Sequence, residues 1–221
     1  MSLVVTGTGT GIGKTVASAV ILARYGKMLR LGYWKPIATG AREGRDVDFV
    51  RRAVGHLAQV LPEEYLFDAP VSPHLAARLE GRTIDPERVL AALVRHGVED
   101  PRRSLVIEGV GGLLVPITER GYLLASLLQE LHLPCVIVAS SALGTINHTL
   151  LTIEAMQSRG LEVAGVVLSG PLNRENVDAI DRFGRVEVVG EIAPIRPLGR
   201  AGVFRAAKSF DRRARLKKFL V

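Results

Sequence analysis

The chain has 221 residues, of which 48% are hydrophobic and 23% charged, and it carries a net charge of +7. This is the composition of a globular protein, and we expect residues 1–221 to form a single domain. No apolar run approaches the roughly 18 residues that a membrane span needs. One cysteine, Cys135, excludes an intrachain disulfide and a cysteine-based metal site. With no basic leader before Leu3, these features predict a cytoplasmic protein.

Much of the excess positive charge lies between Arg205 and Lys218. Such charge can attract nucleic acid, anionic lipid or small phosphorylated ligands. No motif that reads nucleic acid accompanies it. We therefore expect small-molecule partners, with no nucleic acid and no membrane among them.

Short apolar runs alternate with amphipathic stretches along the chain. We predict strands at 3–6, 31–34, 105–108, 135–139, 163–169 and 186–192. We predict helices at 15–25, 46–54, 85–96, 123–131 and 145–159. Asp85 followed by Pro86 is a typical helix start. The segment 55–81 breaks the alternation and shows no clear pattern.

The predicted strands are continuous apolar runs, which indicates burial on both faces. Strands that alternate with helices predict an α/β fold, with a doubly wound, mostly parallel sheet and helices on both faces. Ligands of such sheets bind beyond the carboxyl ends of the strands. The residues at and after Thr6, Trp34, Glu108 and Ser169 are therefore the first candidates for a site.

A glycine-rich turn, Gly7–Thr15, joins the first strand to the first helix. Its backbone N–H groups and the helix N-terminus together form a phosphate site, which makes the fold P-loop NTPase-like. Lys14 would reach the β- and γ-phosphates, and the Thr15 hydroxyl would bind Mg²⁺. The loop is one residue longer than the common motif. The nucleotide-binding residues predicted here are Gly11, Ile12, Gly13, Lys14, Thr15 and Val16.

Charged residues follow the other strands. Lys35 comes directly after the second strand, where it could stabilise a transferred phosphoryl group. Glu108 ends an apolar run and precedes Gly109, Val110 and Gly111. An acid at such a strand end holds Mg²⁺ in P-loop proteins, and a lone buried carboxylate would be costly. Asp46 and Asp48 open the next helix, and either could be a further metal ligand.

The ordered set of motifs resembles the dethiobiotin synthetases, the ATP-dependent ligases of biotin synthesis. The resemblance covers most of the chain, and the ordered set is specific where one motif would be weak. The matching segments are Gly7–Thr15, Lys35-Pro36, Thr39-Gly40, Asp48, Ser72-Pro73-His74, Glu108-Gly109-Val110-Gly111-Gly112, Gly144–His148 and Gly190-Glu191-Ile192.

The resemblance implies the reaction and its small-molecule partners. A diamine, 7,8-diaminononanoate, captures CO2 as a carbamate, which attacks the γ-phosphate of ATP. The resulting carbamic-phosphoric anhydride is closed by the second amine to give dethiobiotin, with ADP and phosphate as the other products. Mg²⁺ is the implied cofactor, and a homodimer is the implied assembly.

The resemblance also implies roles for individual residues. Lys14, Lys35 and Thr10 would act at the reacting phosphoryl group and carbamate, with Thr39 close by. Thr15, Asp48 and Glu108 would hold Mg²⁺. Gly144, Thr145, Ile146 and Asn147 of one subunit would receive the substrate carboxylate bound mainly to the other. Further nucleotide-binding residues would be Gly109, Val110, Gly111, Ser169, Gly170, Ala193, Pro194 and Ile195.

Some features leave alternatives open. Gly9 and Gly11 stand where many members have acidic residues, and Ser169 stands where a base-reading Asn is common, so the preference for one nucleotide base is open.

A ParA/MinD-like switch ATPase remains the alternative function, with the basic segment 210–221 as a membrane-surface helix. Its loop usually has a second lysine, which Thr8–Thr10 lacks. A further rival is the family of amidating synthases of corrinoid biosynthesis, but these need an additional glutaminase domain for which this chain is too short.

We expect Lys35→Ala to reduce turnover by several orders of magnitude and barely alter the fold.

Overall fold

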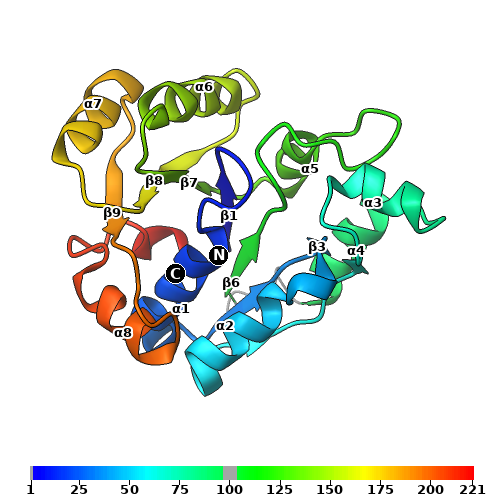
Figure 1. The fold of residues 1–221 in the computed structure, drawn as a ribbon, viewed down its shortest axis with the longest axis horizontal. Helices are drawn as coiled ribbons and strands as arrows, with labels where there is room; N and C mark the ends of the chain where they lie inside the picture. Colours follow the sequence, from blue (N-terminus) through cyan, green and yellow to red (C-terminus); the bar gives the residue numbers. More distant parts are fainter. Residues whose placement is uncertain (1, 97–103) are drawn as a thin grey trace.

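The computed structural model describes residues 2–96 and 104–221. The described residues form a seven-stranded sheet with the order β4-β2-β6-β1-β7-β8-β9, and each pairing between these strands is parallel. Figure 1 shows this sheet at the centre of the molecule. The strands are β1 (Leu3–Gly7), β2 (Leu31–Trp34), β4 (Gln59–Val60), β6 (Ser104–Glu108), β7 (Cys135–Ser140), β8 (Val163–Ser169) and β9 (Val188–Ile192). A separate pair joins β3 (Ile37–Ala38) to β5 (Tyr65–Leu66).

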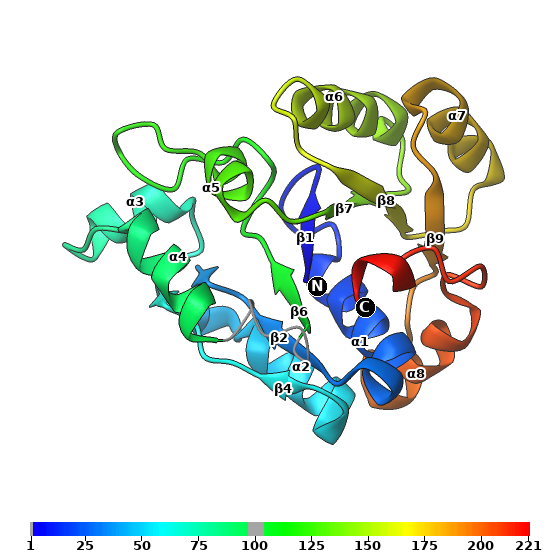
Figure 2. The same ribbon diagram turned by 180° about the vertical axis from the view of Figure 1, so that it is seen from behind.

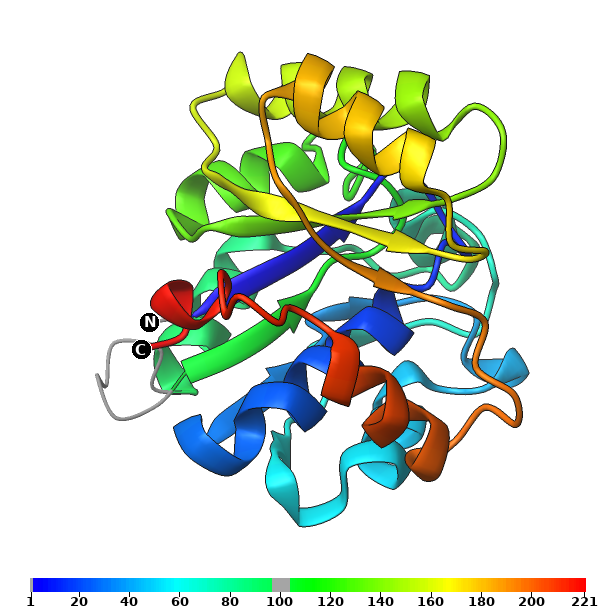
Figure 3. The same cartoon turned by 90° about the vertical axis from the view of Figure 1, so that its left-hand side faces the viewer.

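Helices cover both faces of the sheet, as the edge-on view in Figure 3 shows. On one face lie α1 (Lys14–Leu29), α2 (Asp46–Val54) and α8 (Arg200–Ser209). On the other face lie α3 (Pro73–Leu79), α4 (Pro86–Arg95), α5 (Leu124–Leu131), α6 (Thr145–Gln157) and α7 (Arg174–Gly184). Single 3₁₀ turns are η1 (Ala41–Glu43), η2 (Gly55–Leu57) and η3 (Lys217–Phe219).

The alternation of side chains along β1 builds a separate core on each face. Leu3 and Val5 pack with α1, whereas Val4 packs into the opposite core with the helices of the other layer. All three residues are fully buried. Burial on both faces explains the uninterrupted apolar runs, and the predicted α/β class with a mostly parallel sheet is confirmed.

Several elements were not expected from the sequence. They are the helices α3, α7 and α8 and the two-residue strands β3, β4 and β5. The first helix also extends to Leu29, beyond the predicted residue 25. The strand expected at 186–192 begins at Val188. The parts of the fold that hold the candidate site, at the carboxyl edge of the sheet, lie where they were expected.

The basic segment after α8 packs onto the protein and is not a free amphipathic helix. Phe210, Leu216 and Leu220 are buried in the core beside α1. The Tyr25 hydroxyl donates a 2.5 Å hydrogen bond to Oδ2 of Asp211. Figure 2 shows the segment beside the end of α1. Within residues 2–96 and 104–221, no helix has the length and hydropathy to cross a membrane.

A candidate nucleotide site at the carboxyl edge of the sheet

The loop between β1 and α1 depends on glycine for its shape. Gly11 and Gly13 have φ angles of 72° and 94°, which side chains rarely adopt. A Cβ atom on Gly13 would lie 2.5 Å from the Ser169 Oγ. Gly9 differs, because a Cβ there would meet nothing within 4 Å. The loop thus exposes its N–H groups at the start of α1, as a phosphate site requires.

Lys14 lies buried beneath this loop. Its ammonium group donates hydrogen bonds of 2.6 Å to the carbonyl oxygens of Gly9 and Gly111. Burial lowers the pKa of Lys14 to about 8, although Glu108 acts in the opposite direction. Two neutral carbonyls are weaker partners for an ammonium group than ionised phosphate oxygens would be. The side chain therefore lies in position to exchange one set of partners for the other.

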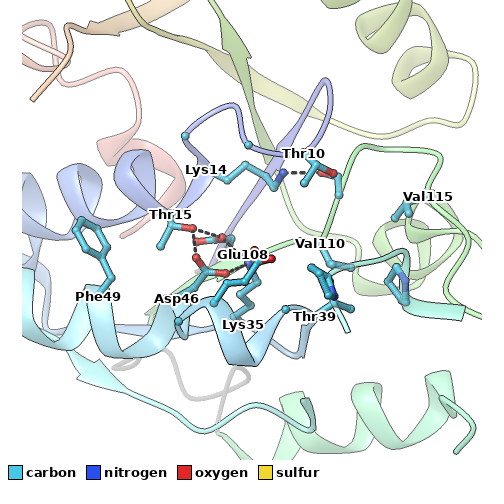
Figure 4. Close-up of a pocket in the computed structure, with 18 of the residues that line it drawn as sticks. Thr10, Lys14, Thr15, Lys35, Thr39, Asp46, Phe49, Glu108, Val110 and Val115 are labelled. Carbon is cyan, nitrogen blue, oxygen red and sulfur yellow. Dashed lines mark hydrogen bonds and ion pairs between the residues drawn. The ribbon is translucent and has the colours of Figure 1, made fainter. Parts of the chain in front are cut away.

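A second cluster lies beside the first turn of α1. The Thr15 hydroxyl is 2.8 Å from Oδ1 of Asp46 and 2.8 Å from Oε1 of Glu108. The Lys35 ammonium donates to Oδ2 of Asp46 and, over 2.9 Å, to Oε1 of Glu108. Figure 4 shows these four side chains pointing toward one another from α1, α2, β6 and the end of β2. The two acids and the lysine predicted at strand and helix ends do converge.

The charges in this cluster stabilise one another. Burial alone would lower the pKa of Lys35, but Glu108 and Asp46 outweigh it and raise that pKa to about 12. Burial opposes ionisation of Asp46, yet Lys35 and the Thr15 hydroxyl hold its pKa below the ordinary value. Lys35 is therefore a permanent cation between two carboxylates at neutral pH.

Glu108 is fully buried, and both of its carboxylate oxygens accept hydrogen bonds. Oε1 faces Thr15 and Lys35, which line the cavity. Oε2 accepts a 3.0 Å hydrogen bond from Ser18 and a 2.8 Å bond from the Tyr33 hydroxyl. Burial, with Glu108 next, raises the pKa of Tyr33 well above its usual value, so Tyr33 remains a neutral donor. Sequence reasoning did not find Ser18 or Tyr33.

The geometry favours Asp46 over Asp48 as the acid of α2 that belongs to this cluster. Asp48, implied as a metal ligand by the family resemblance, pairs with Arg51 at 2.8 Å and does not line the cavity described below. Asp46 is the acid that reaches Thr15 and Lys35. Residues two positions apart on a helix point in roughly opposite directions, because each residue turns the helix by about 100°. Only one of the two could face the cluster.

Thr15, Asp46 and Glu108 could together hold a divalent cation. They present a hydroxyl and two carboxylates, the oxygen donors that Mg²⁺ prefers. The part of the chain that the structure describes has no group of three or more His, Cys, Asp or Glu residues arranged for a metal. Mg²⁺ commonly takes one or two carboxylates and completes its shell with water and substrate phosphates.

Both clusters open into one cavity of about 790 Å³. Eleven lining residues had been predicted for the site; they are Thr10, Gly11, Gly13, Lys14, Thr15, Val16, Lys35, Thr39, Glu108, Val110 and Gly111. The lining residues that were missed are Gly40, Glu43, Gly44, Asp46, Phe49, Pro70, Val71, Ser72, Pro73, Val115 and Leu198. Of these, Asp46 had been a candidate metal ligand, and Gly40 and the Ser72-Pro73 pair belonged to motifs that carry the family resemblance. The wall between Pro70 and Pro73 is uncharged, so the cavity has a charged side and a neutral side.

Other predicted residues do not line this cavity. Ile12 packs against the core, and the Gly109 N–H donates to the Val5 carbonyl. Ser169 lies against the phosphate loop at Gly13. Gly170, Ala193, Pro194 and Ile195 follow β8 and β9, outside the cavity lining. Gly144, Thr145, Ile146 and Asn147 lie at the start of α6, also outside the lining.

Solved structures share the fold at low sequence identity. A ParA family ATPase from Chlorobium tepidum TLS aligns with a TM-score of 0.57 and 13% identity, covering 99% of this chain and 95% of that one. The MinD cell division protein of Aquifex aeolicus aligns with a TM-score of 0.55 and 17% identity, and the alignment covers 96% of this chain and 95% of that one. At such identities the likeness shows the fold alone.

Sequence comparisons are more specific. The model of a family described as "AAA domain" matches residues 1–201. The ATP-dependent dethiobiotin synthetase BioD of Paramagnetospirillum magneticum is 44% identical over 191 residues, which are 86% of this chain and 87% of that protein. The protein of the same name from Agrobacterium fabrum is 42% identical over 201 residues, 88% and 89% of the two chains. The chain therefore belongs to the dethiobiotin synthetase family of ATP-dependent ligases.

Proposed function

We propose that this protein uses ATP to close a cyclic urea on 7,8-diaminononanoate with CO2, giving dethiobiotin, ADP and phosphate. The observation that carries the proposal is the position of Lys35. Its ammonium lies between Asp46 and Glu108 in the same cavity as Lys14 and the phosphate loop. A cation in that position is suited to an anionic acceptor that meets a phosphoryl group.

Residues in the cavity can support each step. One substrate amine adds to CO2 and loses a proton, giving a carbamate whose negative charge Lys35 stabilises. A carbamate oxygen attacks the γ-phosphorus of ATP as the bond to the ADP oxygen breaks. Lys14 leaves the carbonyls of Gly9 and Gly111 to bind phosphate oxygens, and the hydroxyls of Thr10 and Thr39 orient the reactants. Such positioning and charge stabilisation account for most phosphoryl-transfer catalysis.

The second half of the reaction needs little from the protein beyond orientation. The remaining amine attacks the carbonyl carbon of the carbamic-phosphoric anhydride. The bond from that carbon to the phosphate oxygen breaks, and the amine loses a proton as the ring closes. Thr15, Asp46 and Glu108 are the residues that would hold Mg²⁺ in this scheme. When bound there, Mg²⁺ would neutralise charge on the phosphate oxygens.

The neutral wall of the cavity would accommodate the aliphatic part of the diamine. Pro70, Val71, Pro73 and Val115 line this side. A medium-length aliphatic chain gains free energy by leaving water there, at about 0.8 kcal/mol per buried CH₂ group. The two amines would then lie toward Lys35 and the carboxylate would point out of the cavity.

We further propose that the substrate carboxylate binds to residues 144–147 of the partner subunit in a homodimer. In one chain these residues lie outside the cavity lining, at the positive N-terminal end of α6. Leu143 beside them is fully exposed and Leu151 on the same helix is 56% exposed. Exposed leucines near a site support its burial in an interface.

The reaction can be tested with diaminononanoate, labelled bicarbonate, ATP and magnesium. We expect label in an acid-stable cyclic urea and one phosphate released for each ring formed. A failure to form labelled product with any of several nucleoside triphosphates would reject the proposed reaction. The same series measures the base preference, which Ser169 and the glycines of the loop leave open.

The assembly is tested by light scattering under assay conditions. A homodimer should be seen at the enzyme concentration used for turnover. Mixing an inactive Lys35→Ala protein with an inactive Asn147→Ala protein should restore part of the activity, because heterodimers would contain one intact shared site. A monomer that retains full turnover would contradict the shared site.

A further inference from the structure

Glu108 is held from two sides by different kinds of residue. On the cavity side, Oε1 meets Thr15 and Lys35. On the far side, Oε2 meets the hydroxyls of Ser18 and Tyr33, neither of which lines the cavity. Ser18, Tyr33 and Glu108 are each 0% exposed. One carboxylate oxygen therefore meets the two side chains that separate it from the cavity, and the other meets donors inside the protein.

Two donors on one oxygen fix the plane of the carboxylate. A single donor would leave rotation about the last side-chain bond nearly free, since this terminal torsion has a broad energy profile. The bonds from Ser18 and Tyr33 come from different elements, α1 and β2, so rotation would break both. Each bond to a buried charge has a substantial free energy, because no water could replace the lost partner.

We propose that Ser18 and Tyr33 are positioning residues that hold Oε1 of Glu108 toward the divalent cation of the nucleotide complex. The inference rests on the proposed Mg²⁺ site and adds two residues that never touch the metal or substrate. When a cation and phosphates arrive, Thr15 and Lys35 can exchange partners, because both line the cavity. Ser18 and Tyr33 remain behind the carboxylate and keep Oε2 turned away from the cavity.

The test uses Mn²⁺, whose binding is read from the electron paramagnetic resonance signal of the free ion, with the protein saturated with ADP. We expect Tyr33→Phe to weaken Mn²⁺ binding by about tenfold, in the range found for residues that orient metal ligands. Ser18→Ala should act in the same direction. The Mn²⁺ affinity of the double variant should fall by less than the product of the two single effects, because both hydroxyls hold the same oxygen of Glu108.

Tyr25→Phe is a matched control. It also removes a buried tyrosine hydroxyl that donates to a buried carboxylate, Asp211, but outside the cavity lining. Both tyrosine variants should lower the stability of the protein, and only Tyr33→Phe should change Mn²⁺ affinity. Equal Mn²⁺ affinity in Tyr33→Phe, Ser18→Ala and Tyr25→Phe would overturn the inference and leave only a structural role.

The outcomes separate this inference from the function on which it rests. If the unaltered protein with ADP binds no Mn²⁺, the proposed metal site itself fails. If it binds Mn²⁺ and the Tyr33 and Ser18 variants bind equally well, only the positioning role fails. Ser18→Ala keeps the test informative if Tyr33→Phe does not fold, because it independently removes the other donor to Oε2 of Glu108.

Discussion

The ammonium nitrogen of Lys35 lies 2.9 Å from Oε1 of Glu108, and neither side chain has much contact with solvent. The pair connects the ends of the neighbouring strands β2 and β6. Lys35 therefore balances a fully buried negative charge as well as being available to a substrate. The residue therefore has a structural role beside the catalytic one that we propose for it, and the sequence alone did not show the structural role.

Lys35→Ala should abolish most activity and also destabilise the protein. Loss of the cation should lower turnover by a factor of at least about 10²–10³, as for other groups that stabilise developing charge. Leaving Glu108 unpaired should lower the free energy of unfolding by about 3–5 kcal/mol, contrary to the expectation of a barely altered fold. Denaturant unfolding checks this, with Lys35→Ala/Glu108→Gln as control. If the double variant were no more stable than the single one, the unpaired charge would not be the cause.

Asp46→Asn and Asp48→Asn should have opposite outcomes. Asp46 contacts Thr15 and Lys35 in the cavity, so its variant should lose turnover by about 10²-fold or more and require more Mg²⁺. Asp48 pairs with Arg51 at the surface, and such pairs contribute about 0–1 kcal/mol. Its variant should keep near-normal kcat and KM. Mg²⁺ titrations of the steady-state rate make the comparison, and a larger loss in the Asp48 variant would refute the assignment.

Gly13→Ala and Gly9→Ala, two substitutions in the same loop, should have different effects on nucleotide affinity. At Gly13 an added methyl group would meet Ser169 and the backbone has a positive φ, which costs about 1–2 kcal/mol before any clash. Nucleotide affinity should fall by at least about tenfold, measured by calorimetry with ADP. At Gly9 the methyl group has open space, so affinity should change little. Similar affinities in both variants would show that the loop is more adaptable than the structure indicates.

Nucleotide binding should depend on the ionisation of Lys14. Its pKa of about 8 in the empty site means that the side chain is charged below this pH and neutral above it. Phosphates favour the charged form, so ADP affinity should fall as the pH rises above about 8, and binding at pH 8.5 should take up protons. Calorimetry in two buffers of different ionisation enthalpy, with EDTA present, measures this uptake. Lys14→Met should bind more weakly and show no such uptake.

Leu216→Ala should test the packing of the basic C-terminal segment. Leu216 is fully buried, so its truncation should lower the free energy of unfolding by about 2–5 kcal/mol. Leu172, which is 66% exposed, offers the control, and Leu172→Ala should change stability by less than about 0.5 kcal/mol. Thermal or urea unfolding gives both values. A neutral Leu216→Ala would mean that the segment is not part of the core.

The long apolar strands and the phosphate loop could be predicted because each carries a local signal. The run from Leu3 to Thr6 followed by glycines and Lys14 has few other structural interpretations. The missed elements lack such signals. β4 has two residues, too few to show the alternation of a strand. α8 lies partly in the basic stretch that begins at Arg205, where we had predicted no element. In α7 the apolar residues Val177, Ile180 and Phe183 are three positions apart, but Phe183 is largely exposed, so the apolar face is short.

The limits are similar at the site. Glu108 and Lys35 were predicted because they end apolar runs at one edge of the sheet. Asp46 and Asp48 could not be told apart, because the rotation of α2 is set by its packing and not by its first turn. Ser18 and Tyr33 look like ordinary members of a helix and a strand. Their role depends on Glu108, 90 and 75 positions away along the chain.

The contact between Tyr25 and Asp211 has a consequence for how the protein is made. These residues are 186 positions apart, and Asp211 also accepts from the N–H groups of Arg215 and Leu216. The helix that carries Lys14 is synthesised well before Asp211, so part of its surface stays uncovered until the region around Asp211 has left the ribosome. Nascent chains must therefore keep this apolar surface from aggregating while the residues between Tyr25 and Asp211 are synthesised.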